Sequence, residues 1–279
     1  MAIIESIPQI VSKAVLMALE KRLVFRTFFN SDYVGDASEG NSVAIIGVGS
    51  ATVSSYSRNE EITYGVMTDD SQELPLDQED YFAIRIDDLD AVQARPDLLA
   101  ACAKDAVYQL DDVLDSYLAG LLNNGATLDV MDSETTPVSV TSANVLRVLT
   151  RMSRLLDEAK VPRENRGVAV PPWFVEKLVL SGADVRTENA EAFNNGWVGR
   201  CAGFDIRMTN NAPLESDASV VLGASDIAAT AAIQVRKVEK IRLEKFFADG
   251  VRGLTCYGGK VTRPACVARL VCTEGEEAE

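Results

Sequence analysis

The fold of this chain is decided by the stretch PDLLAACAKDAVYQLDDVLDSYLAGLLNNG, residues 96–125. Pro96 stands where a helix can begin, and Asn123, Asn124 and Gly125 are typical of a helix end. A helix of this length spans roughly 40 Å at about 1.5 Å per residue, enough to act as a strut across a whole domain. Its apolar side chains fall on one side, at Leu99, Cys102, Ala103, Ala106, Leu110, Val113, Leu114, Tyr117 and Leu121.

The opposite side of this helix carries Asp105, Asp111, Asp112 and Asp115. Carboxylates suit hard cations such as Mg²⁺ or Ca²⁺, so a metal site is one interpretation. Because these residues point away from the apolar stripe, we instead expect a solvated acidic surface. The sequence therefore predicts no metal site here.

The segment before this helix has the pattern of strands. Residues 42–88 contain SVAIIGVGSATVSSY, EEITYGVM and QEDYFAIRID, which alternate and are rich in β-branched residues. Polar, turn-rich sequence separates them, and Pro75 interrupts regular pairing. An isolated polar hairpin is marginal in water, so we expect this one to need a partner, which a neighbouring subunit could supply.

The N-terminus predicts an amphipathic helix after Pro8, with apolar positions from Ile10 to Leu23 at helical spacing. It has no basic leader and no uninterrupted apolar run of membrane-spanning length. We therefore expect neither a signal peptide nor a membrane span, and synthesis in the cytoplasm.

The segment after the long helix mixes helices and strands. Residues 142–160 predict a helix capped by Ser142, with an Arg154–Glu158 pair on its exposed side. The run GVAVPPWFVEKLVLSG predicts a buried strand followed by a short helix. The chain after about residue 232 returns to strands, which we expect to pack back against the long helix and so make one domain discontinuous in sequence.

Composition narrows the classes of function. The chain of 279 residues is 47% hydrophobic and 25% charged, typical of a folded protein. Its net charge of −15 argues against an electrostatic grip on nucleic acid or anionic lipid. With no histidine, Ser-His-Asp and Cys-His systems and His-containing metal sites are excluded. The cysteines show no CxxC pair, so we expect reduced thiols at Cys102, Cys201, Cys256, Cys266 and Cys272.

The remaining chemical candidates are weak. Arg200 could lower the thiol pKa of Cys201, but no base completes a nucleophile system. The run IGVGSA at residues 46–51 lacks the third glycine of a dinucleotide fingerprint. We therefore predict no catalytic, cofactor-binding or metal-binding residue and no enzyme activity. Trp173 is expected in the core, and Trp197 either in the core or at a subunit contact.

The order of several segments resembles the major capsid proteins of tailed bacteriophages. They are NSDYVGDASEGNSVAI at 30–45, the run LPLDQEDYFAIRIDDLDAVQARPDLLAACAKDAVYQLDDVLDSYLAGL at 74–121, GVAVPPWFVEKL at 167–178, GWVGRCAGFDIRMTNNAP at 196–213 and FADGVRGLTCYGGKVTRPACVA at 247–268. The resemblance covers nearly the whole chain. It implies the Hong Kong 97-like fold, which is α+β.

The resemblance also implies a layout. It places an N-terminal arm at 1–42, an extended E-loop hairpin with flanking strands at 43–87, and the spine helix of a peripheral domain at 88–124. An axial domain follows at 125–235, then returning peripheral-domain strands at 236–272 and an acidic tail at 273–279.

The function implied by the resemblance is that of a major capsid protein. Such subunits assemble as pentamers and hexamers into an icosahedral shell around phage double-stranded DNA, without sequence-specific binding and without a cofactor. The implied partners are other copies of the chain, a portal, a separate scaffolding protein, favoured because the chain starts with Met1 close to the arm, and a decoration protein. Localisation would be the virion, after assembly in the host cytoplasm. Candidate inter-subunit contacts are Arg58, Glu60, Glu61, Asp69, Asp70, Trp197 and Arg200.

One departure from some relatives concerns covalent cross-linking. Those relatives join a lysine in the E-loop to an asparagine of a neighbour, whereas residues 43–86 here contain no lysine. The sequence therefore predicts a shell without cross-links of that type.

Other interpretations stay open at this stage. An encapsulin-like nanocompartment shell protein would share the fold and differ in its cargo. A carboxylate-based or metal-dependent enzyme, an acidic binding module and another virion protein are further alternatives.

Overall fold

The computed structural model describes residues 23–30, 42–45, 55, 58, 72–87, 98–182, 197–243 and 247–276. The amphipathic helix predicted after Pro8 lies outside these residues, apart from Leu23. The elements in chain order are η1 (Phe25–Phe28), β1 (Phe29–Asn30), β2 (Ser42–Ile45), β3 (Gln72–Pro75), β4 (Gln78–Asp87), α3 (Leu98–Gly125), β5 (Leu128–Asp129), β6 (Val138–Val140), α4 (Val145–Glu158), β7 (Arg166–Val170), α5 (Pro172–Leu180), β8 (Trp197–Cys201), β9 (Phe204–Met208), β10 (Leu214–Glu215), β11 (Ala218–Ser225), β12 (Ala229–Arg242), β13 (Ala248–Val261), η4 (Pro264–Cys266) and β14 (Val267–Glu274).

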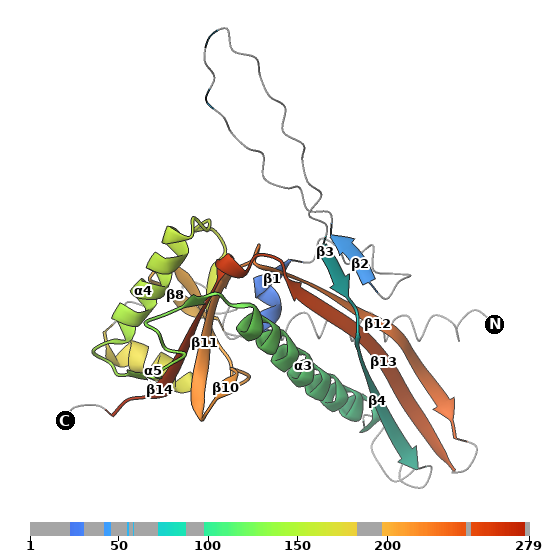
Figure 1. Cartoon of the computed structure of the whole chain (residues 1–279). Coiled ribbons are helices and arrows are strands. Elements are labelled where there is room, and N and C mark those ends of the chain that lie inside the picture. Colours follow the sequence, from blue (N-terminus) through green and yellow to red (C-terminus); the bar gives the residue numbers. More distant parts are fainter. Residues whose placement is uncertain are drawn as a thin grey trace.

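A long, narrow sheet forms one half of the molecule. Its strand order is β1-β12-β13-β4, and β12 and β13 pair antiparallel from Ala229↔Val261 to Arg242↔Asp249. The predicted long helix is present as α3, which lies along this sheet (Figure 1). Leu110 and Leu114 of α3 share a small core with Leu23, Ile233 and Tyr257. The expected return of C-terminal strands to the long helix is thus found for β12 and β13.

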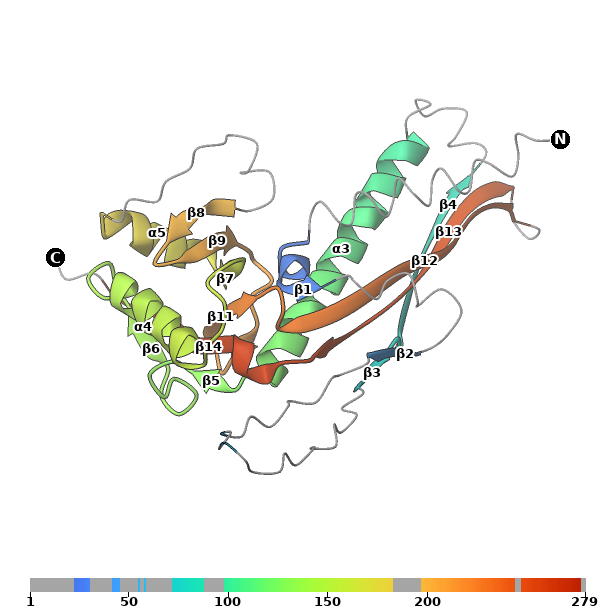
Figure 2. The ribbon, with the colours of Figure 1, turned by 90° about the horizontal axis from the view of Figure 1, so that it is seen from above.

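The other half is built on an eight-stranded sheet with the order β5-β14-β11-β7-β9-β8, to which β6 and β10 also pair. Helices α4 and α5 lie beside this sheet, away from the long hairpin of the first half (Figure 2). Every residue of β7 is buried, as the apolar run GVAV predicts. Most of the main core lies here, between the sheet and the apolar stripe of α4, namely Val145, Val148, Leu149, Met152 and Leu156.

The start of α4 differs from the prediction. The helix begins at Val145, and its N-cap is Asn144 rather than Ser142. The Asn144 side chain accepts a hydrogen bond from the Thr141 backbone N–H at 2.9 Å, which fixes the turn before the helix. The predicted pair between Arg154 and Glu158 is present at 3.2 Å.

The C-terminal strands divide between the two sheets, which corrects the expectation that residues 236–272 return together. β13 ends at Val261, Pro264 opens a short 3-10 turn, and β14 then pairs with β11 in the eight-stranded sheet. The alternating sequence pattern predicted that β14 is a strand. It carries no information about which of the two sheets β14 joins. β14 also extends into the predicted acidic tail as far as Glu274.

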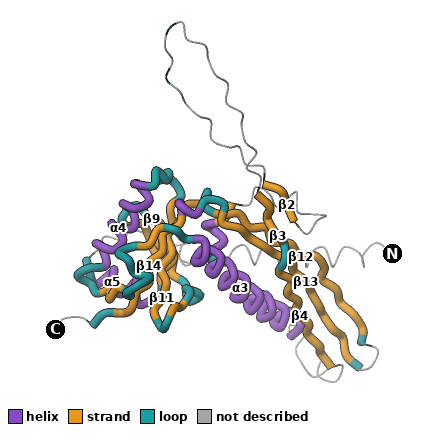
Figure 3. Tube along the Cα trace, viewed as in Figure 1, coloured by secondary structure: helices purple, strands orange, loops and turns teal. Residues whose placement is uncertain are grey.

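Helix α3 is buried on a second side, which corrects the predicted acidic surface. Leu118, Ala119 and Leu122 belong to the main core, because the C-terminal half of α3 packs against the eight-stranded sheet (Figure 3). Asp111 and Asp115 are only 6% and 4% exposed, whereas Val113, expected in the apolar stripe, is 51% exposed. A helix that joins two sheets needs two buried sides. The apolar stripe of the sequence predicted only one of them.

Candidate assembly surfaces

The base of the β2–β3 hairpin is fixed tightly to the long sheet. β2 pairs with β3 from Ser42↔Pro75 to Ile45↔Gln72, and Leu74 and Leu76 are buried where the chain passes to β4. At Gly258 of β13 a Cβ atom would lie 1.9 Å from the Pro75 carbonyl oxygen. The hairpin base therefore crosses β13 at a distance that only glycine permits.

Polar groups hold the same crossing. The Tyr257 hydroxyl donates a hydrogen bond to the Asp80 carboxylate, and the Tyr117 ring meets the Tyr257 ring edge-on at 5.1 Å between centroids. Burial, together with the Asp80 charge, raises the pKa of Tyr257, so the phenol remains a donor. The strands at the hairpin base are therefore held firmly against the long sheet.

Three of the residues predicted as inter-subunit contacts, Arg58, Trp197 and Arg200, are described by the structure. Arg58 is an exposed turn residue. Trp197 and Arg200 lie on β8, the edge strand of the eight-stranded sheet, where Arg200 pairs with Asp205 at 2.9 Å. Glu60, Glu61, Asp69 and Asp70 lie outside the described residues. The assignment of these residues to subunit contacts stays a prediction.

Sequence reasoning missed several exposed apolar side chains at the extremities of the molecule. Phe247, at the start of β13 where the β12–β13 hairpin turns, is 83% exposed. Val179 and Leu180 are exposed at the end of α5, and Tyr81 is exposed on β4. Val179 and Leu180 end the short helix α5, where a side chain has no later turn to pack on, whereas no sequence signal marks Phe247 or Tyr81. They are candidate contact residues beside those predicted.

The arm base, defined here as residues 23–30, joins the two halves. Phe25 and Phe28 are buried in the main core, and Phe29 pairs in parallel with Ala229 of β12. The Phe25 backbone N–H donates a buried hydrogen bond to Asp115 Oδ1 at 2.9 Å. Burial raises the pKa of Asp115 to about 6. No local pattern indicates this contact, because it links residues that are far apart in the chain.

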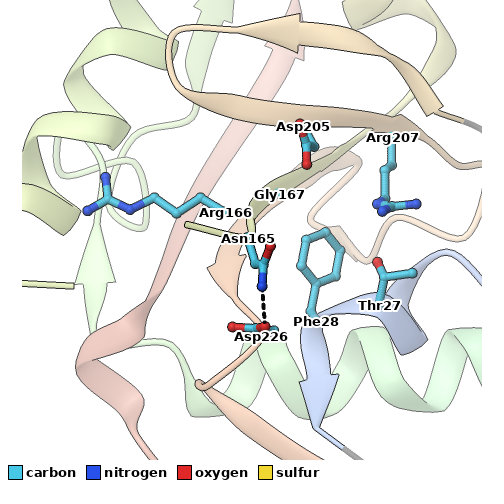
Figure 4. Close-up of a pocket in the computed structure, with 8 residues that line it drawn as sticks. All are labelled: Thr27, Phe28, Asn165, Arg166, Gly167, Asp205, Arg207 and Asp226. Carbon is cyan, nitrogen blue, oxygen red and sulfur yellow. Dashed lines mark hydrogen bonds between the residues drawn. The ribbon is translucent and has the colours of Figure 1, made fainter. Parts of the chain in front are cut away.

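A pocket of about 150 Å³ lies between the arm base and the eight-stranded sheet (Figure 4). Asp205 and Arg207 of β9, Phe28 and Thr27 line it, and Asn165 donates a hydrogen bond to Asp226 at 2.8 Å. Burial lowers the pKa of Arg207, and Asp205 opposes this change. Two arginines, Arg166 and Arg207, and two carboxylates, Asp205 and Asp226, are among the lining residues, so the pocket is polar and its formal charges balance.

Cys201, Cys256, Cys266 and Cys272 form no disulfide bond. Burial raises the pKa of the Cys201 thiol, although Arg200 precedes it. The Arg200 guanidinium is directed to Asp205 instead. Within the described ranges, no cluster of His, Cys, Asp or Glu has the arrangement of a metal site, and none of the helices there is long and apolar enough to cross a membrane.

Comparison with solved structures gives likenesses over nearly the whole chain. A structure from Mycobacterium phage Che8 has 26% sequence identity and a TM-score of 0.72, covering 89% of this chain and 91% of that chain. The capsid structure of cyanophage P-SCSP1u has 16% identity and a TM-score of 0.71, covering 91% and 89%. The capsid of Ralstonia phage GP4 has 10% identity and a TM-score of 0.67, covering 92% and 93%. No protein-family model and no curated protein sequence matches the chain.

The architecture and these likenesses together define the class: the chain has the α+β, Hong Kong 97-like fold of phage capsid proteins. The chain is therefore similar in fold to phage capsid proteins over nearly its whole length, in agreement with the resemblance drawn from the sequence. The matches support a shell protein, and the similar proteins are structural components of virions rather than enzymes.

Proposed function

We propose that this chain is the major capsid protein of a tailed bacteriophage, which assembles as pentamers and hexamers into an icosahedral shell enclosing double-stranded DNA. The observation that carries the proposal is the full-length likeness to the Che8 structure, at 26% identity over 89% of this chain.

The surfaces described above agree with this function. β2 and β3 form a two-stranded sheet of their own, and such a pair is marginal in water, so a neighbouring subunit is the proposed partner of this hairpin. Exposed apolar side chains stand at opposite ends of the molecule, and closed shells need several separate contact patches on each copy. A net charge of −15 lets the inner surface lie beside DNA without binding it strongly.

The layout proposed for this function has an N-terminal arm, an E-loop based on β2 and β3, a peripheral domain on the long sheet and α3, and an axial domain on the eight-stranded sheet. Arg58, Glu60, Glu61, Asp69, Asp70, Trp197 and Arg200 are the proposed contact residues, joined by Phe247, Val179 and Leu180. Portal, scaffolding and decoration proteins are proposed partners, with assembly in the host cytoplasm and final localisation in the virion.

The test is electron microscopy combined with sedimentation of the full chain, expressed alone and then with its neighbouring genes. We expect hollow shells of uniform size, or capsomers that close only when a scaffolding protein is present. A monomer or small oligomer that persists under both conditions would contradict the proposal.

The same experiment separates the encapsulin-like alternative. Shells that form beside portal and terminase genes and contain DNA after infection support the phage capsid. Shells that instead capture an enzyme encoded next to the chain support a nanocompartment.

A further inference from the structure

The side chain of Asp115 lies where three parts of the subunit meet. It belongs to α3, it accepts the Phe25 N–H of the arm base at 2.9 Å, and the Val24 backbone and the Asn211 side chain also hydrogen-bond to it. Asn211 follows β9 of the eight-stranded sheet. One carboxyl group therefore ties together the arm base, the long helix and the eight-stranded sheet.

This carboxyl group borders a cavity of about 220 Å³ between α3 and the segment after β9. From α3 the cavity is lined by Tyr108, Asp111, Asp112 and Asp115, and from the other side by Val24, Met208, Thr209, Asn210 and Asn211. When the arm base separates from α3 and residues 209–211, water reaches Asp115 through this cavity.

The charged groups around Asp115 are mainly of its own sign. Asp111 and Asp112 stand beside it on α3, while residues 208–211 carry no charge. Arg26 is the cation of the arm base, and it donates a hydrogen bond to the Phe29 carbonyl oxygen at 2.9 Å. Lys21 and Arg22 precede the described residues. Burial and the Asp112 charge thus disfavour the ionised carboxylate, whereas its hydrogen bonds favour it.

We propose that Asp115 is a proton-sensitive anchor for the arm base: the junction of the arm base, α3 and residues 209–211 is held most firmly when this carboxyl is protonated, and it opens more readily when the carboxyl is ionised. The protonated group keeps a carbonyl oxygen that accepts the Phe25 N–H, and it gains an O–H that the Asn211 amide oxygen can accept. The ionised group in an opened junction regains water as its partner.

The direction of the effect follows from linkage. Asp115 has a pKa of about 6 in the closed junction and 3.8 when solvated, so the closed form binds the proton more tightly. The stabilisation of the closed form by this proton is complete below pH 3.8. It is lost as the pH rises through about 6, and the junction is easier to open at neutral pH than in acid.

This inference concerns the subunit itself, in any assembly state, and does not depend on the proposed capsid function. If the arm base loosens between pH 5 and pH 7, each subunit of a shell would hold its arm base less firmly at neutral pH than in acid. Such a small bias is sufficient to shift the balance between two packings that are close in free energy.

The test is hydrogen–deuterium exchange of the peptide containing Phe25, measured on the full chain from pH 4.5 to pH 8. Rates are corrected for the intrinsic pH dependence of exchange, and sedimentation at each pH confirms an unchanged assembly state. We expect the protection of this peptide to fall about tenfold or more as the pH rises, with a midpoint near the pKa of Asp115. In Asp115→Asn, which cannot ionise, the protection should not change with pH.

The matched control is Asp112→Asn, because Asp112 is the exposed acidic neighbour on the same helix. This variant should keep the step and move its midpoint to slightly lower pH, since a like charge is removed. A wild-type profile without a step between pH 5 and pH 7 overturns the proposal even if Asp115→Asn fails to fold. An identical step in Asp115→Asn also overturns it.

Discussion

At the residue scale, Arg166 shows how one buried cation can organise a connection between elements. It opens β7, and its side chain is 1% exposed. Its Nε donates to the Pro162 carbonyl oxygen at 2.8 Å, and its terminal nitrogen donates to the Val161 carbonyl and pairs with Asp157 at 2.9 Å. Arg163 binds the same carboxylate from outside, and hydrogen bonds from both arginines lower the pKa of Asp157. These contacts hold the turn between α4 and β7 in place.

We predict that Arg166→Leu destabilises the fold by about 1–3 kcal/mol, because the buried Val161 carbonyl loses its hydrogen-bond partner and Asp157 loses one of its two arginines. The measurement is thermal and denaturant unfolding of the purified chain. Arg163→Ala is the matched control, since it touches the same carboxylate but is 81% exposed, and its melting temperature should stay near that of the wild type. Equal effects from the two substitutions would show that burial of Arg166 is not what matters.

Gly258 is the second residue whose role depends on a close approach. A methyl group there would meet the Pro75 carbonyl, so Gly258→Ala should displace the hairpin base and reduce the yield of assembled shells strongly. The yield is measured by sedimentation and electron microscopy. Gly120→Ala in α3 is the control, because no atom lies within 4 Å of its added carbon. It should assemble normally and melt at a slightly higher temperature, since alanine favours helix. Normal shells from Gly258→Ala would refute this account of the crossing.

At the scale of elements, α3 works as a strut because it is buried on two sides. One side meets the long sheet through Leu110 and Leu114, and the other meets the main core through Leu118 and Leu122. Over about 42 Å at about 1.5 Å per residue, one helix can touch both sheets. Its stability therefore couples the two halves of the subunit.

We predict that Leu122→Ala costs about 2–5 kcal/mol, the range for a large-to-small change in a filled core. Unfolding followed by circular dichroism measures this cost. Val113→Ala on the same helix should change the stability little, because Val113 is half exposed although the apolar stripe of the sequence includes it. If Val113→Ala proved the more damaging of the two, the second buried side of α3 would be misassigned.

At the scale of the whole molecule, assembly through the hairpin should be non-covalent. Residues 43–86 contain no lysine, so this segment cannot supply the lysine of a lysine–asparagine cross-link. Purified particles that are boiled in detergent should run on a gel as a single band at the mass of the chain. A ladder of multiples that resists reducing agent would contradict this prediction and point to a different cross-link.

The sequence determined those features that depend on local pattern. The apolar period of residues 98–125 predicted a long helix, alternation predicted the strands around Gln78–Asp87 and Ala248–Val261, and the run at 166–180 predicted a buried strand followed by a helix. The order of recognisable segments predicted the fold class, which the solved structures confirm. These features could be predicted because each one depends on residues that are close together in the chain.

Only the tertiary structure decided which surfaces are buried and which elements meet. Asp115 lies on the polar side of its helix by sequence, yet the arm base, which is 90 residues away in the chain, covers it. β14 has the same alternating pattern as β13 but joins the other sheet. The periodicity of a sequence shows which faces of a helix or strand are apolar. Whether a face is buried depends on which other segments pack against it. Those contacts form only when segments that are distant in the chain come together.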